Sequence, residues 1–343
     1  MRALVKTKKG KGFIEIEDVP IPHHSSNEVL IKVKVAGICG TDIHIWHDKM
    51  LYWPPVIMGH EFSGEIIKVG ADVIGWKVGD RVVAEPHTRA CGVCWLCRSG
   101  NIHICPHKRS IGWGIDGAFA EYIKMPSHLL HKIPGNVSYE EAALCEPAAI
   151  ALNCVLLTSR VKPGDFVVVE GTGAVGLLAA MAARAAGAGK IMITGVEQDE
   201  KVRLKVAREL GFETLNVERE NIQEKVSILS KEKGADLVVE AAGVEASIDT
   251  AIKITRRMGD IAILGITGQK KVNILWDEAV FKVLNIRFCF SSTYESWERC
   301  LFLMSERIIN TSPLITHTAT LEEWEKLFSQ LEKGNGIKGI FIF

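Results

Sequence analysis

The stretch that decides the fold is "DFVVVEGTGAVGLLAAMAARAAGAG", residues 165–189. Its apolar run, centred on Val168, is typical of a strand buried on both faces of a parallel sheet. In the G-x-G-x-x-G turn that follows, the three glycines allow a tight turn, a close approach of backbone to pyrophosphate, and packing of helix on strand. The N-terminus of the next helix would then face the negative charge. The stretch predicts a strand–turn–helix unit that binds a dinucleotide.

Strands and helices continue to alternate after this unit. Further apolar runs predict strands at 190–194, 236–240 and 260–265. A helix is expected over 200–210, with Val202, Val206 and Leu210 on its apolar face. This alternation predicts an α/β fold with a doubly wound parallel sheet.

The residue that should bind the cofactor ribose is atypical. An acid normally ends the second strand, about 20 residues past the glycines, but Gly195 stands there. Glu197 and Asp199 follow closely and could reach the ribose 2′-hydroxyl; alternatively, the glycine admits a 2′-phosphate beside Lys201 or Arg203. We expect NAD, with NADP as the alternative. The residues expected at the cofactor are Gly171, Gly173, Ala174, Val175, Gly176, Gly195 and Glu197.

Composition narrows the class of protein. The 343 residues correspond to about two domains. Lysine plus arginine (41) equals aspartate plus glutamate (41), so no global field attracts nucleic acid or a membrane surface. The N-terminal segment lacks the apolar core of a signal peptide, and charged residues interrupt the longest low-polarity run, 177–195. We expect a cytoplasmic protein.

Four cysteines share the segment "CGVCWLCRSGNIHIC", residues 91–105. The cytosol keeps thiols reduced, so clustered cysteines there are more often metal ligands than disulfides. Four thiolates satisfy tetrahedral zinc and leave no position for substrate, which predicts a closed structural site made of Cys91, Cys94, Cys97 and Cys105. An iron–sulfur cluster is the main alternative. A redox dithiol fits less well, because four thiols share the loop.

Candidates for a second, catalytic zinc come from three separate segments. Cys39 follows a strand expected over 28–36, His60 and Glu61 adjoin small residues, and Glu146 begins an apolar helix. A catalytic zinc needs three protein ligands and one open position. Each signal is weak alone, since a lone cysteine is usually a small buried hydrophobe.

Together these motifs resemble the zinc-dependent, medium-chain alcohol dehydrogenases over essentially the whole chain. The resemblance rests on "GICGTDIH" (37–44), "GHE" (59–61), "GDRV" (79–82), the four-cysteine loop, "FAEY" (119–122), "EP" (146–147) and "GTGAVG" (171–176). Within the family, the chain most resembles the polyol (sorbitol-type) and threonine dehydrogenase branch, because Glu146 stands where typical alcohol dehydrogenases have a cysteine ligand.

The resemblance implies roles for individual residues. Cys39, His60 and Glu146 match the catalytic zinc ligands, and Glu61 matches a glutamate that can bind the metal or exchange with water. Thr41 matches the hydroxyl that hydrogen-bonds the substrate oxygen, and His44 matches the end of a proton relay. Asp42 matches the residue that orients the zinc-bound histidine. The four loop cysteines match the structural zinc, giving two Zn²⁺ per chain.

The resemblance also implies an architecture and a reaction. A GroES-like, β-rich catalytic domain would comprise 1–148 and 285–343, and a Rossmann domain 149–284. Hydride would pass between a secondary alcohol (a polyol, sugar acid or threonine-like substrate) and NAD(P), through a zinc-bound alkoxide. The partners are then a small-molecule alcohol or ketone and other copies of the chain, as a homotetramer or homodimer.

Three other functions compete with this hypothesis. A zinc-free quinone oxidoreductase of the same fold would not need the three-ligand set or the four-cysteine loop. A non-catalytic, nucleotide-binding redox sensor would not need candidates for every catalytic role. A zinc-ribbon nucleic-acid binder is suggested by the cysteine loop alone, and the balanced charge and the dinucleotide motif argue against it.

Overall fold

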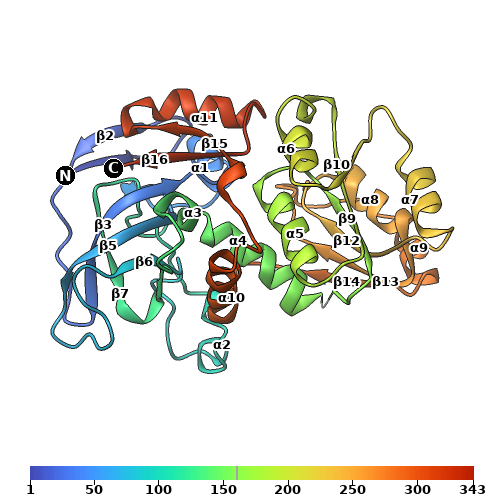
Figure 1. Cartoon of the computed structure of the whole chain (residues 1–343). Helices are drawn as coiled ribbons and strands as arrows, with labels where there is room; N and C mark the ends of the chain where they lie inside the picture. Colours follow the sequence, from blue (N-terminus) through green and yellow to red (C-terminus); the bar gives the residue numbers. More distant parts are fainter. Residues whose placement is uncertain (160) are drawn as a thin grey trace. The chain divides into compact units, whose positions relative to one another are not determined.

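The computed structural model describes residues 1–159 and 161–343. The chain forms most of a first structural unit, then a second unit, and its C-terminal part completes the first (Figure 1). The first unit comprises Met1–Glu146, Ser292–Ser305 and Asn310–Phe343, and the second comprises Pro147–Ser291 and Glu306–Ile309. Each unit has its own hydrophobic core.

The first unit is built mainly of antiparallel strands. Its strands are β1 (Arg2–Lys6), β2 (Ile14–Asp18), β3 (Glu28–Gly37), β4 (Val56–Ile57), β5 (Glu61–Val69), β6 (Arg81–Ala84), β7 (Tyr122–Pro126), β8 (Leu130–Lys132), β15 (Ile315–Ala319) and β16 (Lys338–Ile342). A seven-stranded sheet has the order β15-β16-β3-β5-β6-β8, with β7 also paired to β3, and a three-stranded sheet has the order β2-β1-β4.

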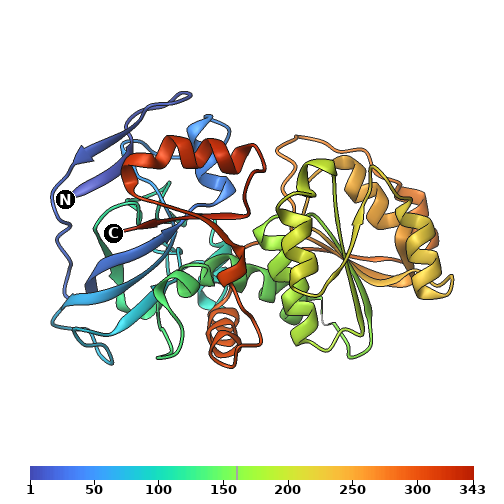
Figure 2. The same ribbon diagram turned by 45° about the horizontal axis from the view of Figure 1, so that its top comes forward.

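Helices cover and flank these sheets. They are α1 (Gly40–Trp46), α2 (Trp95–Arg98), α3 (Tyr139–Ala143), α10 (Tyr294–Ser305) and α11 (Trp324–Glu332), while α4 (Cys145–Leu152) begins here and continues into the second unit. Figure 2 shows α11 lying across the last strands, and it packs on β15, β16 and α1. The final strand, β16, pairs antiparallel to β3, with Phe341 opposite Ala36.

The second unit is the doubly wound sheet predicted from the sequence. Its strands are β9 (Phe166–Glu170), β10 (Lys190–Gly195), β11 (Glu213–Asn216), β12 (Ala235–Glu240), β13 (Thr255–Ile263) and β14 (Asn285–Phe288). All pair in parallel in the order β11-β10-β9-β12-β13-β14. The order reverses between β9 and β12, which is where such sheets bind ligands.

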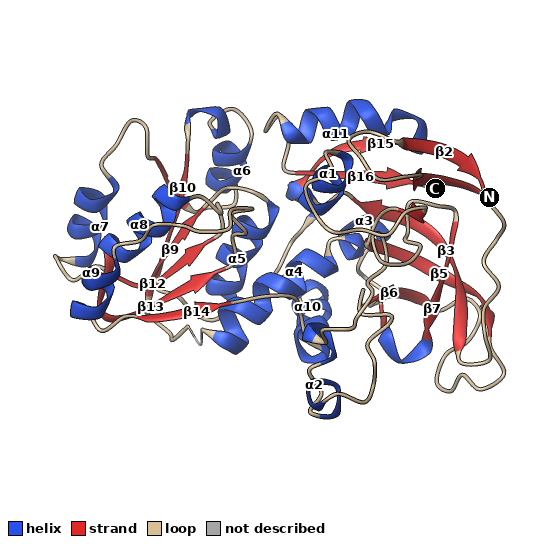
Figure 3. Cartoon of the chain, turned by 180° about the vertical axis from the view of Figure 1, so that it is seen from behind, coloured by secondary structure: helices blue, strands red, loops and turns tan. Residues whose placement is uncertain are grey.

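Helices cover both faces of this sheet (Figure 3). They are α5 (Ala174–Ala185), α6 (Arg203–Glu209), α7 (Ile222–Ser230), α8 (Glu245–Ile254) and α9 (Trp276–Phe281), with a π-helical segment at Asn153–Thr158. Helix α5 packs on β9 and β10, and α8 packs on β12 and β13. Every residue of β9 is buried, as its run of valines predicts.

Two details differ from the sequence expectations. The return to the first unit was expected at residue 285, but residues 285–291 belong to the second unit because β14 pairs with β13. Helix α6 starts at Arg203 rather than near residue 200, and it buries Leu204 and Ala207 rather than the expected valine face. Within the described part of the chain, no helix is long and apolar enough to span a membrane.

Candidate active site and metal centres

Three of the four residues expected at the catalytic zinc come together in the first unit. Cys39 lies between the end of β3 and the start of α1, while His60 and Glu61 lie at the start of β5. The ligand atoms of Cys39, His60 and Glu61 lie within 4.8 Å of one another. The antiparallel pairing of β3 with β5, with Gly37 opposite Glu61, brings these distant segments together.

Asp42 is fully buried beneath this cluster. Its Oδ2 accepts a hydrogen bond from the Cys39 backbone N–H at 2.9 Å, and its Oδ1 lies 4.0 Å from His60 Nδ1. Neither of these last two atoms has a hydrogen-bond partner among the described residues. Because Nδ1 faces Asp42, Nε2 is the imidazole nitrogen left for a metal. Burial raises the pKa of Asp42 to about 6, although His60 and the Cys39 amide act in the opposite direction.

Lys338 is the residue that the sequence analysis missed. It is buried on β16, and its ammonium donates to Glu61 Oε1 at 2.7 Å, Glu61 Oε2 at 2.6 Å and the Ile38 carbonyl at 2.9 Å. All three ammonium protons are therefore used, and both Glu61 oxygens are engaged. The one available signal was a lysine inside the apolar C-terminal run, where a charge requires a buried partner.

Glu146, the fourth expected ligand, is not within the 4.8 Å group but lies close enough to act on it electrostatically. It is buried at the start of α4; burial raises its pKa to about 7, opposed by His60. Burial also disfavours a charged His60, yet Cys39, Asp42 and Glu146 outweigh this effect and raise the pKa of His60 to about 10. The cluster thus gathers a cysteine sulfur, an imidazole and a carboxylate in one place, a donor set that fits Zn²⁺.

The two expected relay residues lie on α1. Thr41 is half-buried in its first turn, two residues after Cys39, and His44 is exposed near its end. The part of the ring that is buried, together with the nearby Lys49 and His47, lowers the pKa of His44. A histidine at this position can exchange protons with solvent, whereas Thr41 is close in sequence to the metal ligands.

The four loop cysteines converge on one point, as predicted. The Sγ atoms of Cys91 and Cys97, and those of Cys94 and Cys105, lie 3.9 Å apart. Four sulfurs at about 2.3 Å from a tetrahedral zinc would be about 3.8 Å from each other. Backbone N–H groups of Cys94 and Cys91 also donate to the sulfurs of Cys91 and Cys105 at 3.4 Å, which favours the thiolate form. The loop therefore fits a closed metal site.

The dinucleotide turn has the expected geometry. Gly171 has φ +112°, and a Cβ there would lie 2.9 Å from the Ala241 backbone, so this position requires glycine. A Cβ on Gly176 would lie 2.1 Å from the Gly171 carbonyl oxygen, which explains the third glycine. Ala174 and Val175 begin α5, whose N-cap Gly173 supplies no side-chain cap. The free N–H groups of this first turn fit a pyrophosphate.

Around Gly195 the structure separates the two candidate acids. Glu197 makes an ion pair with Arg219 and accepts from Asn216 at 3.0 Å. The carboxylate of Asp199 folds back instead, so that a Cβ on Gly195 would lie 3.0 Å from its Oδ2 and 2.8 Å from Thr172 Cγ2. Thr172 Oγ1 is buried without a hydrogen-bond partner among the described residues. This unsatisfied hydroxyl marks a place for a polar ligand atom.

Arg203 and Lys201, expected beside a 2′-phosphate, differ in their surroundings. Arg203 Nη1 donates to Asp199 Oδ1 at 3.2 Å, so its charge is already paired, while Lys201 is exposed. Asp199 Oδ2 accepts from the Val196 N–H at 3.1 Å, which holds the acid in place.

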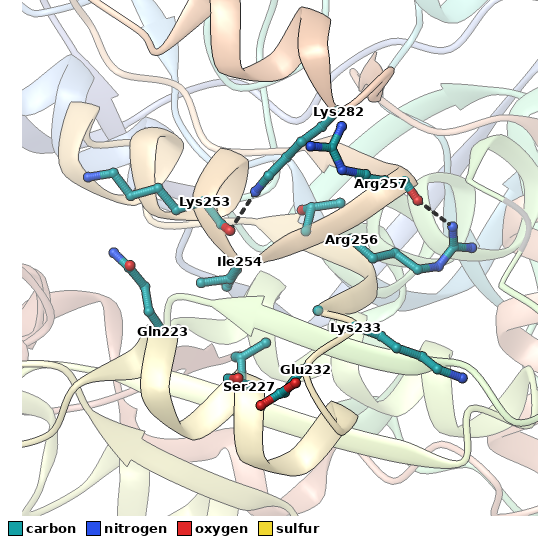
Figure 4. Close-up of a pocket in the computed structure, with 12 residues that line it drawn as sticks. Gln223, Ser227, Glu232, Lys233, Lys253, Ile254, Arg256, Arg257 and Lys282 are labelled. Atoms are coloured by element: carbon teal, nitrogen blue, oxygen red, sulfur yellow. Dashed lines mark hydrogen bonds between the residues drawn. The ribbon is translucent and has the colours of Figure 1, made fainter.

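A separate basic cavity of about 540 Å³ lies at the opposite end of the same sheet, where β12 and β13 begin (Figure 4). Its cations mostly satisfy backbone carbonyls: Lys282 donates to Ile252 and Lys253 at the end of α8, and Arg256 donates to Arg257. Ligands of parallel sheets bind at the carboxyl ends of the strands, so this cavity is not the cofactor site.

Comparison with known proteins agrees with this geometry. Residues 25–135 match the family model described as alcohol dehydrogenase GroES-like domain, and residues 174–306 match that described as zinc-binding dehydrogenase. The chain is 37% identical over 339 residues to a sorbitol dehydrogenase of Halalkalibacterium halodurans (98% of each chain). It is 36% identical over 346 residues to an L-threonine 3-dehydrogenase of Legionella pneumophila (99% of each chain).

A solved structure is also very similar. It is that of a zinc-binding dehydrogenase from Sinorhizobium meliloti bound to NADP, with a TM-score of 0.92 and 29% sequence identity, covering 100% of this chain and 99% of that one. The match extends over both units of the fold.

Proposed function

Because the chain belongs to the zinc-dependent medium-chain alcohol dehydrogenase family and is an NAD(P)-dependent enzyme of that family, we propose that it oxidises a secondary alcohol of a polyol, sugar acid or threonine-like compound. The observation that carries the proposal is the cluster of Cys39, His60 and Glu61, whose ligand atoms lie within 4.8 Å of one another, with Glu146 nearby, in a chain whose second unit has the dinucleotide turn. The relatives in the sorbitol and threonine dehydrogenase branch support the substrate class.

Different residues of the first unit serve metal binding, orientation of a ligand and proton transfer. When bound, zinc supplies a Lewis acid that makes the substrate hydroxyl more acidic. Cys39, His60 and Glu146 would hold the metal, Asp42 would orient His60, and Lys338 keeps the Glu61 carboxylate engaged. Thr41 hydrogen-bonds the substrate hydroxyl and, as it accepts that proton, gives up its own proton toward His44, which lies at the exposed part of α1 and releases it to solvent.

The test is formation of NAD(P)H with polyols, sugar acids, L-threonine and 2,3-butanediol, together with zinc content. Cys39→Ser should lose activity and one zinc. Cys94→Ser, the matched control in the four-cysteine loop, should mainly lose stability. Full activity in Cys39→Ser would show that the cluster is not the catalytic centre.

NAD is the cofactor that this chain prefers, and Asp199 is the acid that hydrogen-bonds the ribose 2′-hydroxyl. Two observations support this assignment: Asp199 occupies the space beside Gly195, and Thr172, which borders the same space, has a buried hydroxyl without a hydrogen-bond partner among the described residues. A carboxylate there can accept from a 2′-hydroxyl and repels a 2′-phosphate.

Cofactor binding tests this assignment independently of turnover. Asp199→Asn keeps the acceptor for the Val196 N–H but removes the charge, so the Kd for NADH should rise about 10-fold relative to that for NADPH, as expected for a hydrogen bond to a charged group. Glu197→Gln is the matched control and should change neither Kd more than about twofold. Tighter binding of NADPH than NADH by the unchanged protein would contradict the assignment.

The chain assembles as a homo-oligomer through the β14 edge of the second unit. Within the described residues β14 pairs only with β13, so its other edge is unpaired. Apolar side chains are exposed near this edge: Phe288 is 82% exposed, and with Trp276 and Val280 it lines a cavity of about 410 Å³. A second copy related by a twofold axis can cover such an edge. Sedimentation of Phe288→Asp should then show monomers; an unchanged mass would exclude this interface.

None of the nine cysteines, all of which lie among the described residues, forms a disulfide in the structure, and five of them lie in the candidate metal sites, which fits a reducing compartment. We therefore place the working enzyme in the cytoplasm, and a disulfide in protein isolated from cells would argue against this location.

A further inference from the structure

The first unit holds a loop rigidly beside the metal ligand His60. The N–H groups of Gly117, Ala118 and Phe119 donate to the carbonyls of Ile57, Gly59 and Met58 at 2.8–2.9 Å. A Cβ on Gly117 would lie 2.1 Å from the Gly59 carbonyl oxygen, so only glycine allows this close approach. Asp116 Oδ1 also accepts from the Ile57 N–H at 3.0 Å. These contacts anchor residues 116–119 against residues 57–59, which directly precede His60.

This loop contributes aromatic and cationic side chains. The Trp113 ring packs edge-on against the His60 ring, with centroids 5.0 Å apart and planes at 83°. The backbone carbonyl of Trp113 accepts a hydrogen bond from the backbone N–H of Trp53 at 2.9 Å. Arg109 Cζ lies 3.6 Å from the centroid of the Trp53 ring. A continuous set of contacts therefore runs from the metal ligand to one guanidinium.

The backbone of Arg109 is fixed by hydrogen bonds, and its guanidinium contacts the Trp53 ring without a carboxylate partner among the described residues. Its carbonyl accepts from Thr88 Oγ1 at 3.0 Å and from the Arg89 N–H at 3.1 Å. Among the described residues, no carboxylate lies within ion-pair distance of its guanidinium, which is half-buried. A guanidinium stacked on an indole keeps its N–H donors in the plane of the group, where they can bind a carboxylate or phosphate at two points.

We propose that Arg109 is a specificity-determining residue that binds an anionic group of the substrate, a phosphate or a carboxylate remote from the carbon that is oxidised. The proposal rests on the proposed function, and it narrows the substrate to polyols or hydroxy compounds that carry a negative charge. Trp113 and Trp53 supply flat apolar surfaces for the C–H faces of the carbon chain between the two ends. Neutral polyols lack the group that pairs with Arg109.

The experiment compares sorbitol 6-phosphate, gluconate and L-threonine with sorbitol and 2,3-butanediol, in the unchanged protein and in Arg109→Met. Methionine keeps an apolar stem against Trp53 and removes the charge. The KM of the preferred anionic substrate should rise about 10- to 100-fold, as for loss of a charge-assisted hydrogen bond, while kcat stays nearly constant. Arg109→Lys should recover part of the loss, and the exposed Arg89→Met is the matched control.

A second measurement separates this inference from the proposed function. The tryptophan fluorescence of the zinc-loaded protein is titrated with sorbitol 6-phosphate and with gluconate, in the absence of turnover. Quenching by one of them that is lost in Arg109→Met supports the anion site and identifies phosphate or carboxylate as its ligand. Equal binding by both proteins, or equal KM values for charged and neutral substrates, overturns it. Turnover of 2,3-butanediol tests the proposed function separately, whatever happens at Arg109.

Discussion

Lys338 offers the sharpest test of how the candidate active site is balanced electrostatically. Its ammonium makes three hydrogen bonds in a fully buried position, two of them to Glu61. Lys338→Met removes the positive charge and keeps most of the apolar volume. Glu61 is then a buried carboxylate without its cation, and breaking a buried ion pair in this way costs about 3–5 kcal/mol.

The expected change can be measured by thermal unfolding. For a unit of this size, about 1 kcal/mol corresponds to about 2–4 °C in Tm, so the metal-free Lys338→Met protein should melt at least about 6 °C lower. With zinc bound the loss should be smaller, because the metal offers Glu61 another positive partner. The double variant Lys338→Met, Glu61→Gln should recover much of the stability, since it leaves no unpaired charge.

A surface pair provides the control. Lys34 and Glu65 lie 3.8 Å apart with about a third of each side chain exposed, and such pairs contribute at most about 1 kcal/mol. Lys34→Met should therefore change Tm very little. The reasoning is refuted if Lys338→Met is no more damaging than Lys34→Met, or if adding Glu61→Gln lowers the stability further.

Two further predictions concern protonation. Glu170 and Glu240 are buried at paired positions of β9 and β12; burial, then the charge of Glu240, raises the pKa of Glu170 well above its ordinary value. Because the carboxyl pKa is raised in the folded protein, the free energy of unfolding falls as pH rises above the pKa of the unfolded chain, near 4.5. Glu170→Gln should therefore raise Tm at pH 8 and change it little at pH 4. An equal effect at both pH values would contradict this prediction. For His44, whose pKa is lowered by burial and by nearby cations, the neutral ring is the relay form, so alcohol oxidation should decline only below pH 6.5. His44→Gln should remove that inflection from the pH–rate profile, and an unchanged profile would exclude the relay.

Much of the fold and of both candidate metal sites follows from signals that are local in the sequence. The valine strand, the glycine turn and the small-residue helix around residue 171 lie within 25 consecutive residues, so steric rules alone specify their conformation. The cysteine loop is equally local, because its spacing determines which thiols can meet. Strand periodicity also predicted that Cys39 follows β3, as the structure confirms.

Only the tertiary structure decided which distant groups meet. Lys338 and Glu61 are 277 residues apart, and no local pattern specifies a buried ion pair across β16 and β5. The proposal of Asp199 rather than Glu197 at the ribose rests on how a short turn folds back onto Gly195. The assignment of residues 285–291 depended on strand pairing, and the buried face of α6 on which side chains reach the sheet. Local sterics act between neighbours in the sequence, whereas burial and charge pairing depend on the packing of the whole unit.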